Sequence, residues 1–290
     1  MQQIRKSVTA TISQAGLQPY GGFIPVKEMT VANLTDGSDG TATDDEYANM
    51  IKEACDVSNI TPSNMGLVVD YMLRTELALM YGFTPMQALK NAFFVGIQGA
   101  MLVGKGKEVE KMLKKIAKEL EREDRDDYNY NTIVINASRI VVYDAVVRAG
   151  YFDPTAEPPK PSTTDADVIN LMIGALLVHF LEKEKGLLEL GVGFSAIDSK
   201  NISPSDGDYL TEDSLIDLKT SKTKPNTKDT LQLLVYYIMG LHEKPEVYNN
   251  IKYLKIINPK LGKIYTYETA KISDETIQHV GREIIGYDEV

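Results

Sequence analysis

The sequence has no tryptophan, a single cysteine and only three histidines among its 290 residues. The one cysteine, Cys55, excludes an intrachain disulfide, a cysteine-rich zinc site and a cysteine-ligated iron–sulfur cluster. Long apolar runs are also missing, because stretches such as Leu171–Leu181 are too short to span a bilayer and contain His179. No apolar run follows the first residues as it would in a signal peptide. We therefore expect a soluble cytoplasmic protein without a membrane partner.

Basic residues are outnumbered by acidic ones, 31 to 41, which gives a formal net charge of −10. A net negative charge argues against a nucleic-acid partner. The acidity is uneven, however: residues 200–290 carry 12 Lys and Arg against 14 Asp and Glu, whereas residues 1–199 carry 19 against 27. The charge therefore does not exclude a nucleic-acid substrate, and it marks the N-terminal region as the expected place for a protein partner or self-association.

Several enzyme motifs are absent or incomplete. No Gly-x4-Gly-Lys-Ser/Thr phosphate loop occurs, so we expect no ATP hydrolysis by this chain. The run Gly191–Ala196 imitates a dinucleotide fingerprint but lacks the preceding strand and the acidic residue that the fingerprint requires. With three histidines available, no convincing serine or cysteine nucleophile arrangement can be drawn.

The first half of the chain predicts helices. Thr61-Pro62 and Thr84-Pro85 are helix starts, and residues 107–125 show an apolar stripe at helical spacing that is typical of a solvated amphipathic helix. Four prolines then fall between residues 154 and 161, which predicts a stiff extended linker. We take this linker as the boundary between a mainly helical region, 1–155, and a second domain, 156–290.

The second half predicts an α/β domain. We expect a helix over 165–189, a hairpin over 209–218, an apolar helix over 227–240, a second hairpin over 251–268 and a last helix that Ser273 caps.

Three charged residues on the first of these hairpins point to chemistry. Asp208 lies near the start of one predicted strand, and Asp217 and Lys219 lie two positions apart on the next, so their side chains share a face. Facing carboxylates form an oxygen site for a hard cation such as Mg²⁺, and a neighbouring lysine can hold a phosphate or orient a water. An isolated Asp-x-Lys is weak evidence, as Asp198-Ser-Lys200 shows. The motif Asp217-Leu-Lys219 differs from it because Gln232 and Tyr236 follow, spaced i, i+4 on an apolar helix.

The set Asp208, Ile-Asp217-Leu-Lys219-Thr, Gln232-x3-Tyr236 resembles the PD-(D/E)XK nuclease superfamily, in the branch that contains RecB-type nuclease domains and Cas4-like exonucleases. The wider run from Gly207 to Pro259 also resembles a group of bacterial proteins of similar length. The resemblance covers roughly residues 165–290. It implies a restriction-endonuclease-like mixed sheet flanked by helices, behind the mainly helical N-terminal region. It also implies a deoxyribonuclease that works in DNA repair, mobile elements or phage defence.

Carried over, the resemblance makes Asp208 and Asp217 ligands of Mg²⁺ or Mn²⁺, with the carbonyl of Leu218 sharing the cation. Lys219 becomes the catalytic lysine, and Gln232 and Tyr236 contact and position the DNA. The branch often takes a further ligand from the helix before the hairpin. The candidates for that ligand are His179, which is equally compatible with a buried structural histidine, and Glu182 or Glu189; Asp206 competes with Asp208. The cluster-binding cysteines of the Cas4-like proteins are missing, so no iron–sulfur cluster is expected.

Lysines follow the predicted catalytic strand at 222, 224 and 228. Beside a phosphodiester site, Lys222, Lys224 and Lys228 would contact the nucleic-acid backbone, although a solvated loop explains them equally well. Lysines 252, 255, 260 and 263 could extend the surface. The leading hypothesis is a metal-dependent DNA nuclease. The alternatives are a non-catalytic binding or regulatory module with the same fold, and a nuclease that is silent until a partner activates it.

Overall fold

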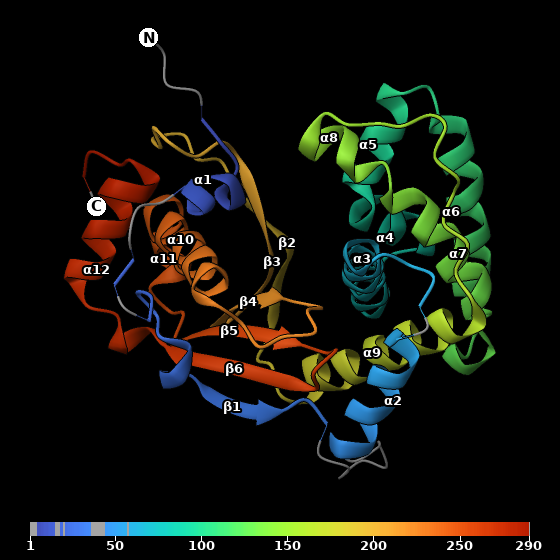
Figure 1. Ribbon diagram of the computed structural model, residues 1–290, viewed down its shortest axis with the longest axis horizontal. Coiled ribbons are helices and arrows are strands. Elements are labelled where there is room, and N and C mark those ends of the chain that lie inside the picture. The colour runs from blue at the N-terminus through green and yellow to red at the C-terminus, as the bar shows by residue number, and fades with distance from the viewer. Residues whose placement is uncertain (1–4, 15–17, 20, 36–43, 57, 290) are drawn as a thin grey trace. The chain divides into compact units, whose positions relative to one another are not determined.

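The computed structural model describes residues 5–14, 18–19, 21–35, 44–56 and 58–289 (Figure 1). The chain divides into two compact units. We call Met1–Leu34 together with Glu182–Val290 the sheet unit, and Thr35–Leu181 the helical unit.

The sheet unit is built on six strands in the order β1-β6-β5-β4-β3-β2. Their bounds are β1 Thr30–Asn33, β2 Leu187–Phe194, β3 Ser205–Thr211, β4 Ser214–Leu218, β5 Tyr253–Asn258 and β6 Lys263–Glu268. Neighbouring strands pair antiparallel except β4 and β5, which are parallel and are joined through a helix. The expectation of an α/β protein with a mixed sheet flanked by helices is therefore confirmed.

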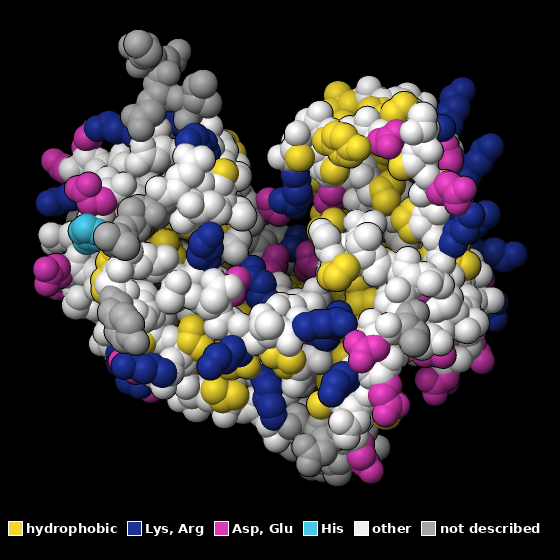
Figure 2. Space-filling model, viewed as in Figure 1, with side chains coloured by type: hydrophobic (Ala, Val, Ile, Leu, Met, Phe, Trp, Pro, Cys, Tyr) yellow, Lys and Arg dark blue, Asp and Glu magenta, His cyan; other side chains and the backbone are white. Residues whose placement is uncertain are grey.

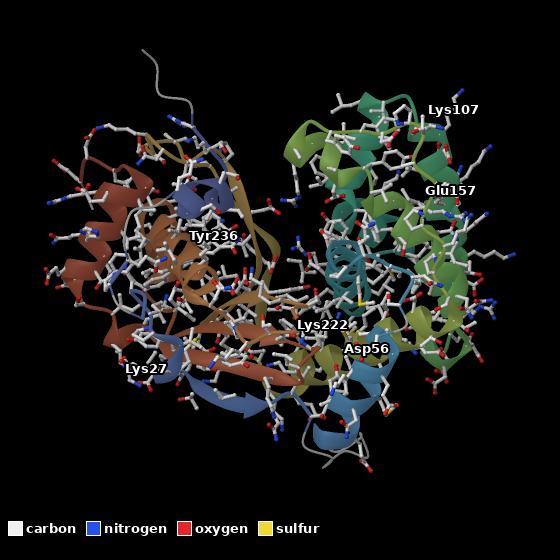
Figure 3. The ribbon with its side chains drawn as sticks, viewed as in Figure 1. Lys27, Asp56, Lys107, Glu157, Lys222 and Tyr236 are labelled. Carbon is white, nitrogen blue, oxygen red and sulfur yellow. The ribbon has the colours of Figure 1, made fainter. Side chains whose placement is uncertain are left out.

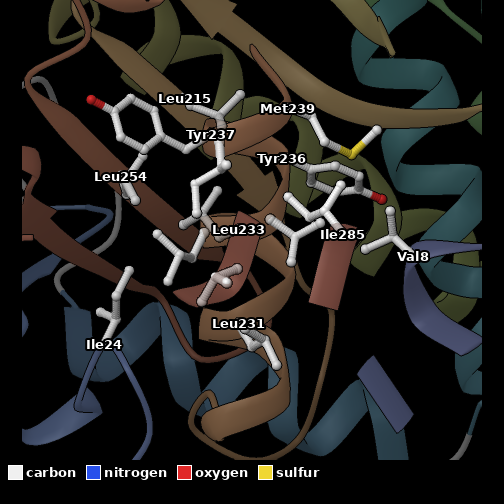
Figure 4. Packing of buried hydrophobic residues seen from close by; sticks show 14 of the residues in the cluster. Val8, Ile24, Leu215, Leu231, Leu233, Tyr236, Tyr237, Met239, Leu254 and Ile285 are labelled. Atoms are coloured by element: carbon white, nitrogen blue, oxygen red, sulfur yellow. The ribbon is translucent and has the colours of Figure 1, made fainter. Parts of the chain in front are cut away.

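Helix α10 (Thr227–Glu243) connects β4 to β5 and packs against the sheet. Its buried residues include Leu231, Leu233, Leu234 and Met239, and the core they enter contains Leu215 and Leu254 from the sheet (Figure 4). Around it lie α1 (Val8–Gln14), α11 (Pro245–Tyr248), α12 (Asp274–His279) and the π-helical turn η4 (Val280–Ile285). The short 3-10 turns of this unit are η1 (Val26–Glu28) and η3 (Thr269–Lys271).

The helical unit consists of eight helices among the residues that the structure describes, with one 3-10 turn, η2 (Arg125–Asp127). Their bounds are α2 Asp44–Asp56, α3 Pro62–Met80, α4 Pro85–Ala92, α5 Phe94–Leu102, α6 Gly106–Leu120, α7 Tyr130–Val141, α8 Asp144–Ala149 and α9 Thr163–Glu182. Thr61 and Thr84 cap α3 and α4 through their side chains, with proline at the first helical position, as the sequence predicts.

The boundary between the units does not fall at the proline-rich segment. The first 34 residues belong to the sheet unit because β1 pairs with β6 and α1 packs on α10. Helix α9 belongs to the helical unit, where Asp165 in its first turn accepts hydrogen bonds from Ser58 Oγ at 2.5 Å and Asn59 N at 3.3 Å. The prolines therefore lie within the helical unit, and the expected boundary at 155 does not coincide with this division.

The expected helix over 165–189 is wrong at its C-terminal end. Helix α9 stops at Glu182, and residues 187–194 form β2, which pairs with β3. Gly186 makes the turn between them with φ at +41°, and a Cβ at this position would collide with Glu212. Sequence periodicity missed β2 because its residues vary from half-exposed to buried without a clean alternation.

By length and composition alone α9 could cross a bilayer, since its apolar window has a mean hydropathy of 1.4. However, 61% of that window is buried within the protein, and the buried core helix of a folded protein has the same composition.

Candidate active site

The predicted hairpin brings Asp208 to the end of β4. Strands β3 and β4 pair Tyr209 with Ile216 and Leu210 with Leu215, and the turn is closed by Ser214 N donating to Thr211 Oγ1 at 3.1 Å. Beyond the last pair, Asp208 Oδ2 accepts the backbone N–H of Leu218 at 2.7 Å. The Asp208 carboxylate therefore lies against the backbone of the strand that carries the Asp-x-Lys motif.

Asp217 is the buried member of the site, with 3% of the residue exposed. Its Oδ2 lies 2.7 Å from Lys219 Nζ, as the shared face of β4 predicts, and no second donor among the described residues reaches this oxygen. Burial raises the pKa of Asp217; the Lys219 ammonium opposes this rise, and the Asp208 carboxylate adds to it. The result is a buried carboxylate that has one cationic partner, Lys219, and a second carboxylate, Asp208, acting on it.

Lys219 is held from two sides. Its Nζ contacts Asp217 and donates to Gln232 Oε1 at 2.9 Å. Burial lowers the pKa of Lys219, but Asp217 and Asp208 outweigh burial and raise it above its ordinary value. The lysine is therefore a fixed ammonium ion in this arrangement.

Helix α10 supplies the rest of the site. It starts in a capping box, in which Asn226 accepts from Lys228 N at 2.8 Å and Asp229 Oδ2 accepts from Asn226 N at 2.8 Å. One turn later Gln232 Nε2 donates to the Tyr236 hydroxyl at 3.2 Å, so the predicted i, i+4 pair is in contact.

Tyr236 closes the chain of contacts that begins at Asp217. Its ring stacks on Phe194 of β2 with centroids 5.2 Å apart and planes 4° from parallel. Figures 3 and 4 label Tyr236. Burial raises the pKa of the Tyr236 phenol, and the carboxylates of Asp217, Asp208 and Asp206 raise it further. Tyr236 is therefore a neutral hydrogen-bonding group, and the nearby acidic residues include Asp206, the predicted competitor of Asp208.

The sequence also proposed a further ligand from His179, Glu182 or Glu189, and this stays a prediction. Glu182 is half-exposed beside Lys183, and Glu189 accepts from Lys244 Nζ at 2.8 Å. His179 is buried in the helical unit with Phe180 edge-on to its ring, so its role as a ligand stays a prediction. Among the described residues no group of three or more His, Cys, Asp and Glu side chains is placed to hold a metal ion.

The loop after β4 carries two of the predicted backbone-binding lysines, Lys222 and Lys224, and the first turn of α10 carries the third, Lys228. Lys222, which Figure 3 labels, Lys224 and Lys228 are all exposed. The buried amide of Asn258 fixes this loop by donating to Ser221 O at 3.0 Å, while its Oδ1 accepts from Lys260 N at 3.1 Å. Lys222 and Lys224 therefore extend from a loop that is tied to the end of β5.

Three residues around the site were missed from the sequence. The charge of Asp229 raises the pKa of both Asp217 and Lys219. Phe194 stacks on Tyr236, and Asn258 donates to the loop that follows β4. Asn226-x-x-Asp229 is a capping-box pattern and could have revealed Asp229, but nothing local marks Phe194 or Asn258 because their partners are distant in sequence.

The arrangement suits hydrolysis of a phosphodiester. It combines two carboxylates for a hard cation, a fixed ammonium ion for a phosphate oxygen or a water, and a neutral amide–phenol pair beside them. No protein-family model, no curated protein and no solved structure matches this chain.

Proposed function

We propose that this protein is a metal-dependent nuclease of the PD-(D/E)XK type that hydrolyses phosphodiester bonds in DNA. The observation that carries the proposal is the continuous contact Asp217–Lys219–Gln232–Tyr236, with Asp208 beside it. Residues from two strands and a helix, up to 28 positions apart in the sequence, meet in one polar cluster inside an otherwise apolar packing layer.

The residues fit a divalent cation. Lys219 is the one donor that reaches the buried Asp217 Oδ2 among the described residues, and the Asp208 carboxylate adds a second negative charge, so a further positive charge would stabilise the pair. Mg²⁺ commonly takes only one or two protein carboxylates and completes its octahedron with waters and substrate phosphate oxygens, so a set of two carboxylates is adequate. Asp208 and Asp217 would hold Mg²⁺ or Mn²⁺. When bound, the cation would neutralise charge that develops on the phosphoryl oxygens.

The other residues bind and orient. Lys219 places its ammonium ion beside the scissile phosphate and stabilises the negative charge of the transition state. Gln232 holds the lysine, and Tyr236 holds Gln232, so the two side chains keep Lys219 in one rotamer. Lys222, Lys224 and Lys228 contact backbone phosphates on either side of the reacting one.

A direct test is degradation of supercoiled, linear and single-stranded DNA by the purified full chain with Mg²⁺ or Mn²⁺. Lys219→Ala should reduce the rate by at least about 100-fold, the range expected when one positioned charge is removed from the transition state. Lys200→Ala is the matched control, because Asp198-Ser-Lys200 has the same spacing but Lys200 is exposed and pairs with Asp288. If neither metal supports cleavage of any of the three substrates, or if both variants keep the wild-type rate, the proposal fails for the chain acting on its own.

The non-catalytic alternative is separated by metal binding. Titration calorimetry with Mn²⁺ should show binding to the wild type that Asp217→Asn abolishes and Asp198→Asn leaves unchanged. Binding without cleavage would indicate a nuclease that requires a partner, whereas no binding to the wild type would favour a regulatory module.

A further inference from the structure

Helix α6 of the helical unit carries an unbroken row of positive charge. Five of its lysines lie within an arc of about 100° when residues are placed at 3.6 per turn. They are Lys107, Lys111, Lys114, Lys115 and Lys118, which we call the lysine stripe, and all five are exposed. Figure 2 shows lysine and arginine side chains projecting on the side of the helical unit where α6 lies in Figure 1, and Figure 3 labels Lys107 there.

The opposite face of α6 fixes the stripe in place. Val109, Leu113, Ile116 and Leu120 are buried against neighbouring helices, with at most 4% exposed. Because the buried arc is centred opposite the lysines, the helix cannot roll to hide them. Lys118 lies eleven positions after Lys107, so the stripe is about 16 Å long.

Most of these lysines have no acidic partner. Two of the three glutamates of α6 pair with residues outside the stripe: Glu108 with Lys105 at 3.2 Å and Glu119 with Arg122 at 2.9 Å. Within the stripe, Lys114 alone is paired, with Glu110 at 2.8 Å. Lys107, Lys111, Lys115 and Lys118 make no ion pair with any residue that the structure describes. The stripe is thus a local exception in a chain whose net charge is −10.

We propose that the lysine stripe binds the phosphate backbone of a nucleic acid, as a contact separate from the candidate active site. A regular row of like charges without base-reading groups matches a polyanion whose own charges repeat, since duplex DNA carries one charge per about 1.7 Å of its axis. The contact positions the chain on the nucleic acid and reads no sequence.

Two other anionic partners fit the stripe less well. A helix that lies on a membrane inserts an apolar face beside its basic one, and here the apolar face of α6 is already buried in the protein. A protein partner is held mainly by aromatic and arginine anchors in desolvated pockets, and the stripe contains neither. The acidic residues Glu121, Glu123 and Asp124 follow α6 directly, so the surface ends near Lys118.

The test is fluorescence anisotropy with labelled duplex DNA over a range of salt concentrations, in EDTA so that no cleavage occurs. The variant replaces the four unpaired lysines, Lys107, Lys111, Lys115 and Lys118, with glutamine. The slope of log affinity against log salt should become less steep by about 0.9 for each lysine that contacts a phosphate, and affinity at low salt should fall at least about tenfold.

A matched control removes the same charge elsewhere. Lys160, Lys183, Lys200 and Lys271 are exposed and ion-paired, and changing them to glutamine alters the net charge equally. The control should keep the wild-type slope, and the four Lys→Arg changes in the stripe should keep binding. Equal loss in the control, or an unchanged slope in the stripe variant, would overturn the inference.

Further experiments distinguish DNA from other anionic ligands and test binding to the stripe independently of the proposed nuclease activity. Duplex RNA in place of DNA tells which nucleic acid is preferred. Vesicles of phosphatidylserine that bind through the same lysines while DNA does not would refute the proposal. Binding to the stripe is measured in EDTA and cleavage is measured separately with Mg²⁺ or Mn²⁺, so a failure of cleavage and a failure of the stripe are seen independently.

Discussion

Replacing Gly240 with alanine should destabilise the sheet unit and disturb the candidate site together. Gly240 lies one turn after Tyr236 on α10, and its missing side chain makes room for the ring of Tyr248. A Cβ at this position would overlap three atoms of that ring. Tyr248 is fully buried, with 0% exposed, so the ring cannot move aside without displacing its neighbours.

Helix propensity and core overpacking change the free energy of unfolding of Gly240→Ala in opposite directions. Alanine is the better helix former by about 1 kcal/mol. Overpacking a dense core costs about 1–3 kcal/mol or more, and an overlap with a buried ring belongs at the upper end of that range. We therefore expect a net loss of about 2 kcal/mol in the free energy of unfolding. Gly174→Ala in α9 is the control, because the nearest atom to its Cβ is 4.0 Å away, and it should gain about 0.5–1 kcal/mol.

Urea denaturation followed by circular dichroism gives the free energies, and hydrogen exchange assigns each change to the sheet unit or the helical unit. The double variant Gly240→Ala/Tyr248→Leu should show a favourable coupling of about 1–3 kcal/mol, since the smaller side chain relieves the overlap. DNA cleavage should fall in Gly240→Ala because the shift of α10 moves Gln232 and Tyr236. If Gly240→Ala is as stable as Gly174→Ala, the packing argument is refuted.

Other expectations follow from buried polar contacts. Asp165→Asn should cost about 1–2 kcal/mol, because Asp165 Oδ2 accepts from Ser162 N at 2.8 Å in the capping box of α9. Burial raises the pKa of Asp165, but its hydrogen bonds from Ser58, Ser162 and Asn59 outweigh burial and lower the pKa below the ordinary value of 3.8. The stabilisation that the ionised Asp165 gives the folded state is therefore complete above that pH and is lost as pH falls through the lowered pKa. Urea denaturation at neutral and acid pH should show this loss in the wild type and not in the variant. Arg125→Met should cost about 3–5 kcal/mol because it leaves Glu76 buried without its ion pair at 2.5 Å, and a thermal-denaturation midpoint unchanged from the wild type would contradict this.

Local signals account for much of the secondary structure. The Thr-Pro starts of α3 and α4 and the turn of the β3–β4 hairpin depend on residues a few positions apart, so they can be predicted from the sequence. Strand β2 could not be predicted from the sequence, because it is stabilised by pairing with β3 and the residues that connect the two strands show no regular sequence pattern. The first 34 residues were not expected to join the sheet for the same reason. All four residues of β1 are exposed, so no buried face marks it as a strand, and it pairs with β6, which lies more than 200 residues later in the sequence.

The candidate site also combines features that can be predicted from the sequence with features that depend on tertiary packing. The face shared by Asp217 and Lys219, and that shared by Gln232 and Tyr236, follow from the periods of a strand and a helix. The contact between the two pairs, Lys219 Nζ to Gln232 Oε1, requires α10 to cross back over β4 at one angle and depth, which the core packing sets. The burial of Asp217 and its raised pKa have the same origin.

The sequence by itself determined which residues could do the chemistry: its near-absence of cysteine, histidine and tryptophan removes most alternatives and leaves carboxylates, lysines and one glutamine–tyrosine pair. It also determined the lysine stripe, because a rigid helix converts spacing directly into a face. Tertiary structure decided which charges meet. Asp217 is paired and buried while Asp198, with the same spacing to its lysine, is exposed, because burial depends on neighbours that only folding brings together.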